Sequence, residues 1–230
     1  MLLSKFIMLI SRIFITFLLI VLTGSLVAQP TKVDPTDRQG WVVSKFALDL
    51  HKKWKVEAEY QRRYYKNISA YYGSFYGLNV QKKLNKSFTL EADYMLSKIF
   101  RGTYNSYSAG FSIEKKLGDI KSDLRILYQN QTLDYYKVTR ETTFKNIIRA
   151  RFRFRYPIIK KFDITVSTEP IWKYQSSFKI DNYRHEVSLK YSPTKRWDCQ
   201  VFYINRPDFS KSYRRQFHIF GLGLNYQLKL

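Results

Sequence analysis

Four arginines at every second position, Arg149, Arg151, Arg153 and Arg155, are the side chains of this sequence most able to do chemistry. Apolar and aromatic residues stand between them, so an extended strand would place all four guanidinium groups on one face. A column of cations could bind anionic solutes along the path of a pore. It could equally pair with carboxylates in a network that fills the available space, and both interpretations stay open.

Charged residues in other segments are candidate partners for this column. Lys121, Asp123 and Arg125 precede it with the same spacing, and Asp163 and Glu169 follow it. If segments that are neighbours in sequence pair as adjacent strands, these side chains face the arginines. We therefore expect a nearly neutral face, with most of the net charge, +20 once Lys5 and Arg12 of the N-terminal 28 residues are left out of the total of +22, in turns and loops. The same alternation assigns four more acidic partners to this face: Glu57, Glu59, Glu91 and Asp93.

The elements that must position these residues are strands, because apolar and polar residues alternate with a period of two. Residues 54–60 and 88–94 show this pattern most clearly. Each predicted strand has about the ~9–11 residues that a tilted strand needs to cross a membrane. The pattern predicts strands at 41–50, 54–65, 70–82, 88–98, 106–115, 120–130, 145–156, 162–172, 183–191, 197–205 and 217–230.

Short turns rich in lysine alternate with longer connections, such as 131–144 and 206–216. Outer-membrane barrels combine short periplasmic turns with longer external loops. The sequence therefore predicts an all-β fold, a transmembrane antiparallel up-and-down β-barrel. An arginine directed at lipid near mid-membrane would cost ~2–4 kcal/mol, so the arginine column should line the lumen.

Aromatic residues at the strand ends predict two girdles, because amphipathic rings favour the interface between membrane and water. The girdle on the side of the short turns would contain Trp54, Phe88, Phe162 and Trp197. The girdle on the side of the long loops would contain Tyr64, Tyr72 and Trp172.

The number of strands is expected to be even, as is usual for these barrels. Eleven strands are visible, and by the turn assignment the first and the last both run toward the short turns. We therefore expect twelve strands, with residues 29–40 as a weak twelfth, and ten as the alternative. Residues 29–40 could instead thread through the lumen.

The N-terminus predicts export. Lys5 and Arg12 precede an uncharged run at 13–27, and Ala28 follows, which is the pattern of a cleaved signal peptide. The predicted organisation is a signal peptide at 1–28, a polar leader at 29–40 and one barrel domain at 41–230. We expect a location in the bacterial outer membrane, contacts with its lipids and lipopolysaccharide, and insertion by the barrel-assembly machinery. Export excludes nucleic acid as a partner.

Signals for catalysis are few. His218 follows Ser210 and Ser212, but no acid is placed to orient the ring, and no metal-ligand cluster or phosphate loop occurs. We expect no enzyme activity, no metal and no cofactor. The first functional hypothesis is a narrow passive channel for small polar or anionic solutes. The alternatives are a closed structural or interaction barrel whose loops meet a partner, and a lipid-modifying barrel enzyme with His218 as its base.

The sequence resembles an outer-membrane family catalogued as domain of unknown function 2490. The resemblance rests on residues 41–50 with the following run His51-Lys52-Lys53-Trp54-Lys55, on the repeated Lys-Lys hairpins and on the closing Gly221-Leu222-Gly223-Leu224-Asn225-Tyr226. It would cover about residues 40–230. It implies a barrel from a Bacteroidetes-like outer membrane, and it brings no established activity or catalytic residues.

Overall fold

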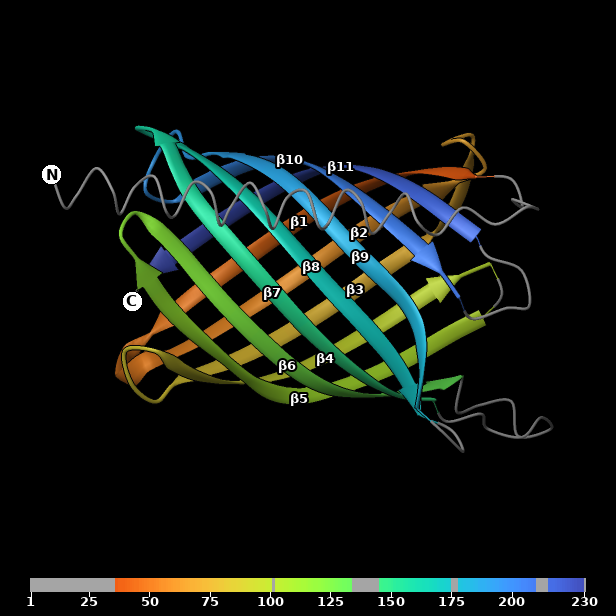
Figure 1. The fold of residues 1–230 in the computed structure, drawn as a ribbon, viewed down its shortest axis with the longest axis horizontal. Helices are drawn as coiled ribbons and strands as arrows, with labels where there is room; N and C mark the ends of the chain where they lie inside the picture. Colours follow the sequence, from red (N-terminus) through yellow and green to blue (C-terminus); the bar gives the residue numbers. More distant parts are fainter. Residues whose placement is uncertain (1–35, 101, 134–144, 175–177, 210–214, 230) are drawn as a thin grey trace, which may run out of the picture. The chain divides into compact units, whose positions relative to one another are not determined.

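Eleven β-strands close into one barrel in the part of the chain that the structure, a computed structural model, describes (Figure 1). The described residues are 36–100, 102–133, 145–174, 178–209 and 215–229. A short 3₁₀ helix, η1 (His51–Lys53), joins the first two strands. The strands are β1 (Asp37–Leu50), β2 (Trp54–Tyr65), β3 (Ala70–Lys83), β4 (Phe88–Ile99), β5 (Gly102–Leu117), β6 (Ile120–Leu133), β7 (Lys145–Ile159), β8 (Phe162–Tyr174), β9 (Phe178–Tyr191), β10 (Trp197–Asp208) and β11 (Arg215–Lys229).

Each strand pairs antiparallel with its neighbours in sequence, and the barrel closes where β1 pairs with β11 in parallel. The parallel register extends from Asp37↔Phe217 to Asp49↔Lys229. The expectation of twelve strands, or ten, is therefore wrong. Both terminal strands run toward the short turns, and parallel hydrogen bonding between them removes the open edge without a further strand.

The predicted leader at 29–40 also needs correction, because β1 already begins at Asp37. Residues 1–35 lie outside the described residues, so the signal peptide and the remainder of the leader stay predictions. Among the described residues, no helix is long and apolar enough to cross a membrane.

The predicted strand starts that follow the short turns agree with the structure, whereas several other boundaries fall short, including the end of β7 at Ile159 rather than at 156. β9 begins at Phe178 rather than at 183, and β5 begins at Gly102 rather than at 106. Lysine, glycine and aromatic residues mark the short turns. At one of them Gly118, with φ of +61°, occupies the left-handed backbone region that a two-residue hairpin turn requires. The loop-side ends carry mixed polar residues, which obscure the alternation.

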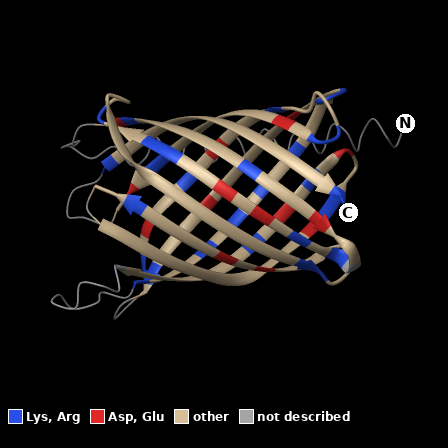
Figure 2. Ribbon diagram, turned by 180° about the vertical axis from the view of Figure 1, so that it is seen from behind, with Lys and Arg blue, Asp and Glu red and all other residues tan. Residues whose placement is uncertain are grey.

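Side chains alternate between the lumen and the outer face along every strand. Acidic and basic residues lie along the strands, and lysines and arginines gather at the short turns near the end of β11 (Figure 2). A hydrophobic cluster also lies inside the barrel: Trp41 of β1, Ile204 of β10 and Ile219 of β11, with Phe202 and Phe217 packed against them.

Candidate functional site

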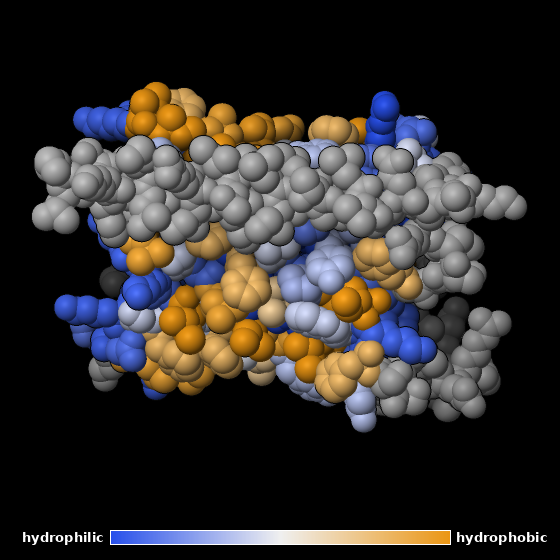
Figure 3. All heavy atoms as spheres, viewed as in Figure 1, coloured by the Kyte–Doolittle hydropathy of each residue, from blue (hydrophilic) through white to orange (hydrophobic). Residues whose placement is uncertain are grey.

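The outer face of the barrel is apolar along the middle of the strands. Val42, Leu78, Val201 and Leu222 point outward, and 47% to 59% of each residue is exposed. Figure 3 shows apolar side chains over much of one outer face, with hydrophilic ones at its two ends. A soluble monomer rarely exposes so extensive an apolar surface.

Pairs of aromatic rings, two of them stacked and one tilted, border this apolar belt on the side of the short turns. Centroid distances are 5.4 Å for Phe88–Phe111, 4.6 Å for Phe162–Tyr191 and 4.7 Å for Trp197–Tyr226. Trp54 is 39% exposed, and the Lys82 ammonium lies over its ring. The four residues expected in the turn-side girdle thus all lie on the outer face, at the ends of their strands next to the short turns.

A second aromatic row lies nearer the long loops, and its hydroxyls have polar partners. The rings of Tyr94 and Tyr107 are 5.1 Å apart, and the Tyr94 hydroxyl donates to Asn105 Oδ1 at 2.7 Å. The Tyr203 hydroxyl and His218 Nδ1 are 2.6 Å apart. This pairing of ring and polar group is typical of side chains that sit where lipid meets water.

Of the residues expected in the loop-side girdle, Tyr64 and Trp172 face outward and Tyr72 does not. A bulge between Arg63 and Tyr64 shifts the register of β2 against β3. Tyr72 consequently stacks on lumen-facing Phe75, with 6.3 Å between centroids. The period of two cannot predict a bulge, so Tyr72 departs from its expected place.

All four arginines of the column lie on the lumen side of β7. Register pairs three of them with charged residues of β6, Lys121↔Arg155, Asp123↔Arg153 and Arg125↔Arg151, and pairs Arg149 with Leu127. The lumen therefore holds this column as the alternation predicts, together with its neighbours on β6.

Glu169 of β8 is the centre of the largest charge cluster in the described lumen. Arg149 donates to its carboxylate from Nε at 3.1 Å and from Nη2 at 2.9 Å. Arg125 Nη2 lies 3.3 Å away and Arg184 Nη1 lies 3.7 Å away. Only 5% of Glu169 is exposed. Arg125 also reaches Glu91, at 3.9 Å, so β4, β6, β7, β8 and β9 are joined across the lumen. We call this group the Glu169 cluster.

The other predicted acidic residues are also placed inside, and each has a basic or polar partner. Asp123 binds Arg153 and lies 3.5 Å from Arg151 Nη2. Lys190 Nζ lies 3.0 Å from Asp163. Lys45 Nζ lies 3.0 Å from Glu57 and 2.7 Å from Glu59, and Lys55 Nζ lies 3.3 Å from Glu57. The Asn79 side-chain amide donates to Asp93.

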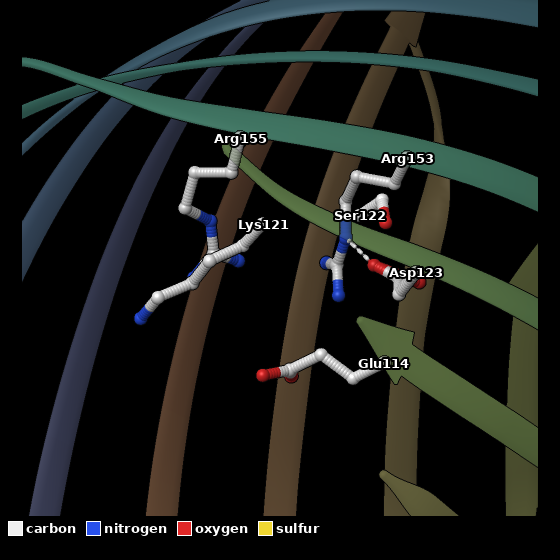
Figure 4. Close-up of a pocket in the computed structure, with 6 residues that line it drawn as sticks. All are labelled: Glu114, Lys121, Ser122, Asp123, Arg153 and Arg155. Atoms are coloured by element: carbon white, nitrogen blue, oxygen red, sulfur yellow. Dashed lines mark hydrogen bonds and ion pairs between the residues drawn. The ribbon is translucent and has the colours of Figure 1, made fainter. Parts of the chain in front are cut away.

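Two predicted lumen cations, Arg155 and Lys121, have no ion pair within the described residues. They lie side by side near the short turns, whereas Arg153 is turned toward Asp123 (Figure 4). Arg155 lines two cavities. One has about 20 Å³ and includes Glu114, and the other has about 90 Å³ and extends toward β8, β9 and β10.

Apolar packing inside the barrel is the feature that sequence reasoning missed. The Arg63 guanidinium lies between two rings, 3.8 Å from the centroid of Trp41 and 3.7 Å from that of Phe75. Because the alternation is interpreted as apolar side chains facing lipid and polar ones facing the lumen, apolar residues are not expected in the lumen. All nine buried hydrophobic residues of the described chain face the lumen: Trp41, Val43, Ala47, Phe75, Leu127, Ile147, Ile171, Ile204 and Ile219.

Two of the histidines lie on the outer face, and each has a hydroxyl group within hydrogen-bond distance. His185 Nδ1 lies 3.1 Å from the Thr168 hydroxyl, and His218 pairs with Tyr203, both on the outer face. Among the described residues, no group of three His, Cys, Asp or Glu side chains could hold a metal ion. Ser210 and Ser212 lie outside the described residues.

Comparison with known proteins places this barrel in a family. The chain matches the family described as Protein of unknown function (DUF2490) over residues 38–217. The chain belongs to this family. The resemblance drawn from residues 41–50 and the following run is thereby confirmed. The closing glycine motif lies beyond the matched residues. No curated protein matches the chain.

Solved structures with similarity include two outer-membrane proteins of low sequence identity. OccK8 (OprE) of Pseudomonas aeruginosa matches with a TM-score of 0.37 and 9% identity, and the matched region covers 72% of this chain and 57% of the OccK8 chain. OccAB3 of Acinetobacter baumannii matches with a TM-score of 0.36 and 14% identity, and the matched region covers 70% of this chain and 51% of the OccAB3 chain. The chain thus spans little more than half the length of these proteins.

Proposed function

We propose that this chain is a non-enzymatic barrel of the bacterial outer membrane whose lumen is closed at mid-height, and that it serves as a structural or interaction scaffold. The observation that carries the proposal is the inverted distribution of side chains. Apolar residues such as Leu222 are exposed on the outer face, while Glu169 and Ile219 are buried in the lumen. Lipid would cover the outer belt, and packed side chains block the interior.

Closure follows from what crosses the lumen. The Glu169 cluster joins strands on opposite sides of the barrel with ion pairs of 2.9 to 3.9 Å. Toward the loops, Arg63 packs between Trp41 and Phe75. These side chains fill much of the cross-section at this level, and only 6% of the Glu169 side chain remains exposed.

The exposed ends suggest which surfaces meet other molecules. Lysines of the short turns, including Lys83, Lys116 and Lys161, would face the periplasm and contact anionic headgroups, each contributing ~1 kcal/mol near the surface. The long loops would face lipopolysaccharide and an external partner. Insertion would require the barrel-assembly machinery.

Single-channel recording tests the proposal. The mature protein, refolded and inserted in a planar bilayer, should give no steady conductance. Folding and insertion are verified in parallel vesicles by protease protection of the strands. A steady conductance with anion preference, weakened in an Arg149→Ala/Arg153→Ala variant, would overturn closure and make the arginine column the selectivity element of a channel.

A further inference from the structure

We propose that the cavity of about 90 Å³ on the short-turn side of the Glu169 cluster binds a small inorganic oxyanion such as phosphate. This oxyanion site goes beyond the proposed scaffold role, because binding from the turn side does not require an open lumen. The cavity volume is several times the ~10–15 Å³ that one buried water needs. A free oxyanion therefore fits the cavity.

The first argument is the set of cations that line the cavity. Arg151, Arg153, Arg155 and Lys190 all contribute to its wall. Carboxylates approach three of them: Asp123 lies against Arg151 and Arg153, and Asp163 against Lys190. Arg155 alone among these four has no carboxylate within ion-pair distance in the described chain, so its full set of donors is available to a ligand.

The second argument is a buried donor without an acceptor. The Arg151 Nε atom is buried and has no hydrogen-bond partner in the described chain. Leaving such a donor unsatisfied is unfavourable, and more so when the group is charged. An anion in the adjoining cavity would supply an acceptor to the same arginine.

The third argument is the set of neutral donors on the strands beside the arginines. Thr165 and Ser167 of β8 are the register partners of Arg155 and Arg153, and Ser188 of β9 lines the cavity next to them. Each of these three residues is less than 10% exposed. Gln200 of β10 adds an amide. Guanidinium groups next to hydroxyls form a set that suits an oxyanion, because its several oxygens can accept from all of these donors.

One residue of the wall opposes an anion, and it makes the inference sharply testable. Glu186 of β9 is the only carboxylate that lines this cavity within the described residues, and it has no ion pair there. At 0.1 M ionic strength charges interact within ~10 Å. Glu186→Gln should therefore tighten phosphate binding, whereas Arg155→Gln should weaken it.

The experiment is calorimetric titration of inorganic phosphate into the full mature protein folded in detergent micelles, with chloride at the same ionic strength as the competing anion. We expect saturable binding that Arg155→Gln weakens at least tenfold and Glu186→Gln strengthens several-fold. Lys160→Gln, in the short turn beside β8, makes the same charge change as Arg155→Gln without lining the cavity, and should leave binding unchanged.

A second measurement protects the test against a variant that fails to fold. Phosphate should shield Arg155 of the wild-type protein from phenylglyoxal, read by peptide mass spectrometry, while Arg62 on the outer face is modified at an unchanged rate. The inference is overturned if phosphate does not bind, if chloride competes at equal concentration, or if Lys160→Gln weakens binding as much as Arg155→Gln. Equal modification of Arg155 with and without phosphate would overturn it as well.

Discussion

Replacing Glu169 with glutamine should destabilise the barrel more than any other single neutralisation of a lumen acid. The substitution keeps the shape of the side chain and removes the charge that Arg149, Arg125 and Arg184 share. Removing one partner of a buried ion pair typically costs ~3–5 kcal/mol, because the remaining charges stay desolvated without compensation. That is a large part of the ~5–15 kcal/mol by which folded proteins are usually stable.

The assay is urea unfolding of the mature protein in lipid vesicles, followed by tryptophan fluorescence and compared at equal lipid content. Asp163→Asn is the matched control, since Lys190, at 3.0 Å, is its single ion-pair partner among the described residues and its side chain is 24% exposed. A partly exposed pair contributes about 0–1 kcal/mol. If Glu169→Gln lowers the free energy of unfolding by no more than Asp163→Asn does, the Glu169 cluster does not hold the lumen together.

Three further predictions concern the outer face, the inner packing and the closure. Leu222→Arg, on the outward-facing middle of β11, should lower the free energy of unfolding in vesicles by ~2–4 kcal/mol. The control Asp119→Arg, in a short turn, should leave this free energy unchanged. If both variants lower it equally, burial of the belt in lipid is contradicted. Gly221→Ala would place a Cβ 1.9 Å from the Phe202 ring and should cost about 1–3 kcal/mol in urea unfolding, while Gly223→Ala meets nothing closer than 3.4 Å and should be nearly neutral. Ser44→Cys with Leu224→Cys, in a Cys199→Ala background, should form a β1–β11 disulfide, because these residues are register partners, and the disulfide should shift the band on non-reducing gels. The positive control is Leu224→Cys with the native Cys199, its register partner on β10. If the control cross-links and the β1–β11 pair does not, parallel closure is refuted.

The course of the strands could be predicted because their signals are local. Lysine-rich turns followed by Trp54, Phe88 or Trp197 mark where strands begin, and these starts agree with the structure. The inward direction of Arg149 and its neighbours follows from alternation alone, since one face of each strand must be apolar if lipid covers it. At the loop ends the outward residues become polar, so the contrast between the faces fades and the predicted strands stop short.

The sequence by itself therefore determined the all-β repeat, the outward or inward direction of most strand positions and the charged residues of the lumen, since each of these depends only on neighbours along the chain. Tertiary structure alone decided how the barrel closes, because the parallel pairing of β1 with β11 joins the two ends of the described barrel. It also decided the partners of each charge. Glu169 collects arginines from β6, β7 and β9, and which of them reach it depends on the tilt and stagger of strands around the lumen. The packing of Trp41 against Ile204 and Ile219 has the same origin, because only a closed cross-section brings inward apolar residues into contact.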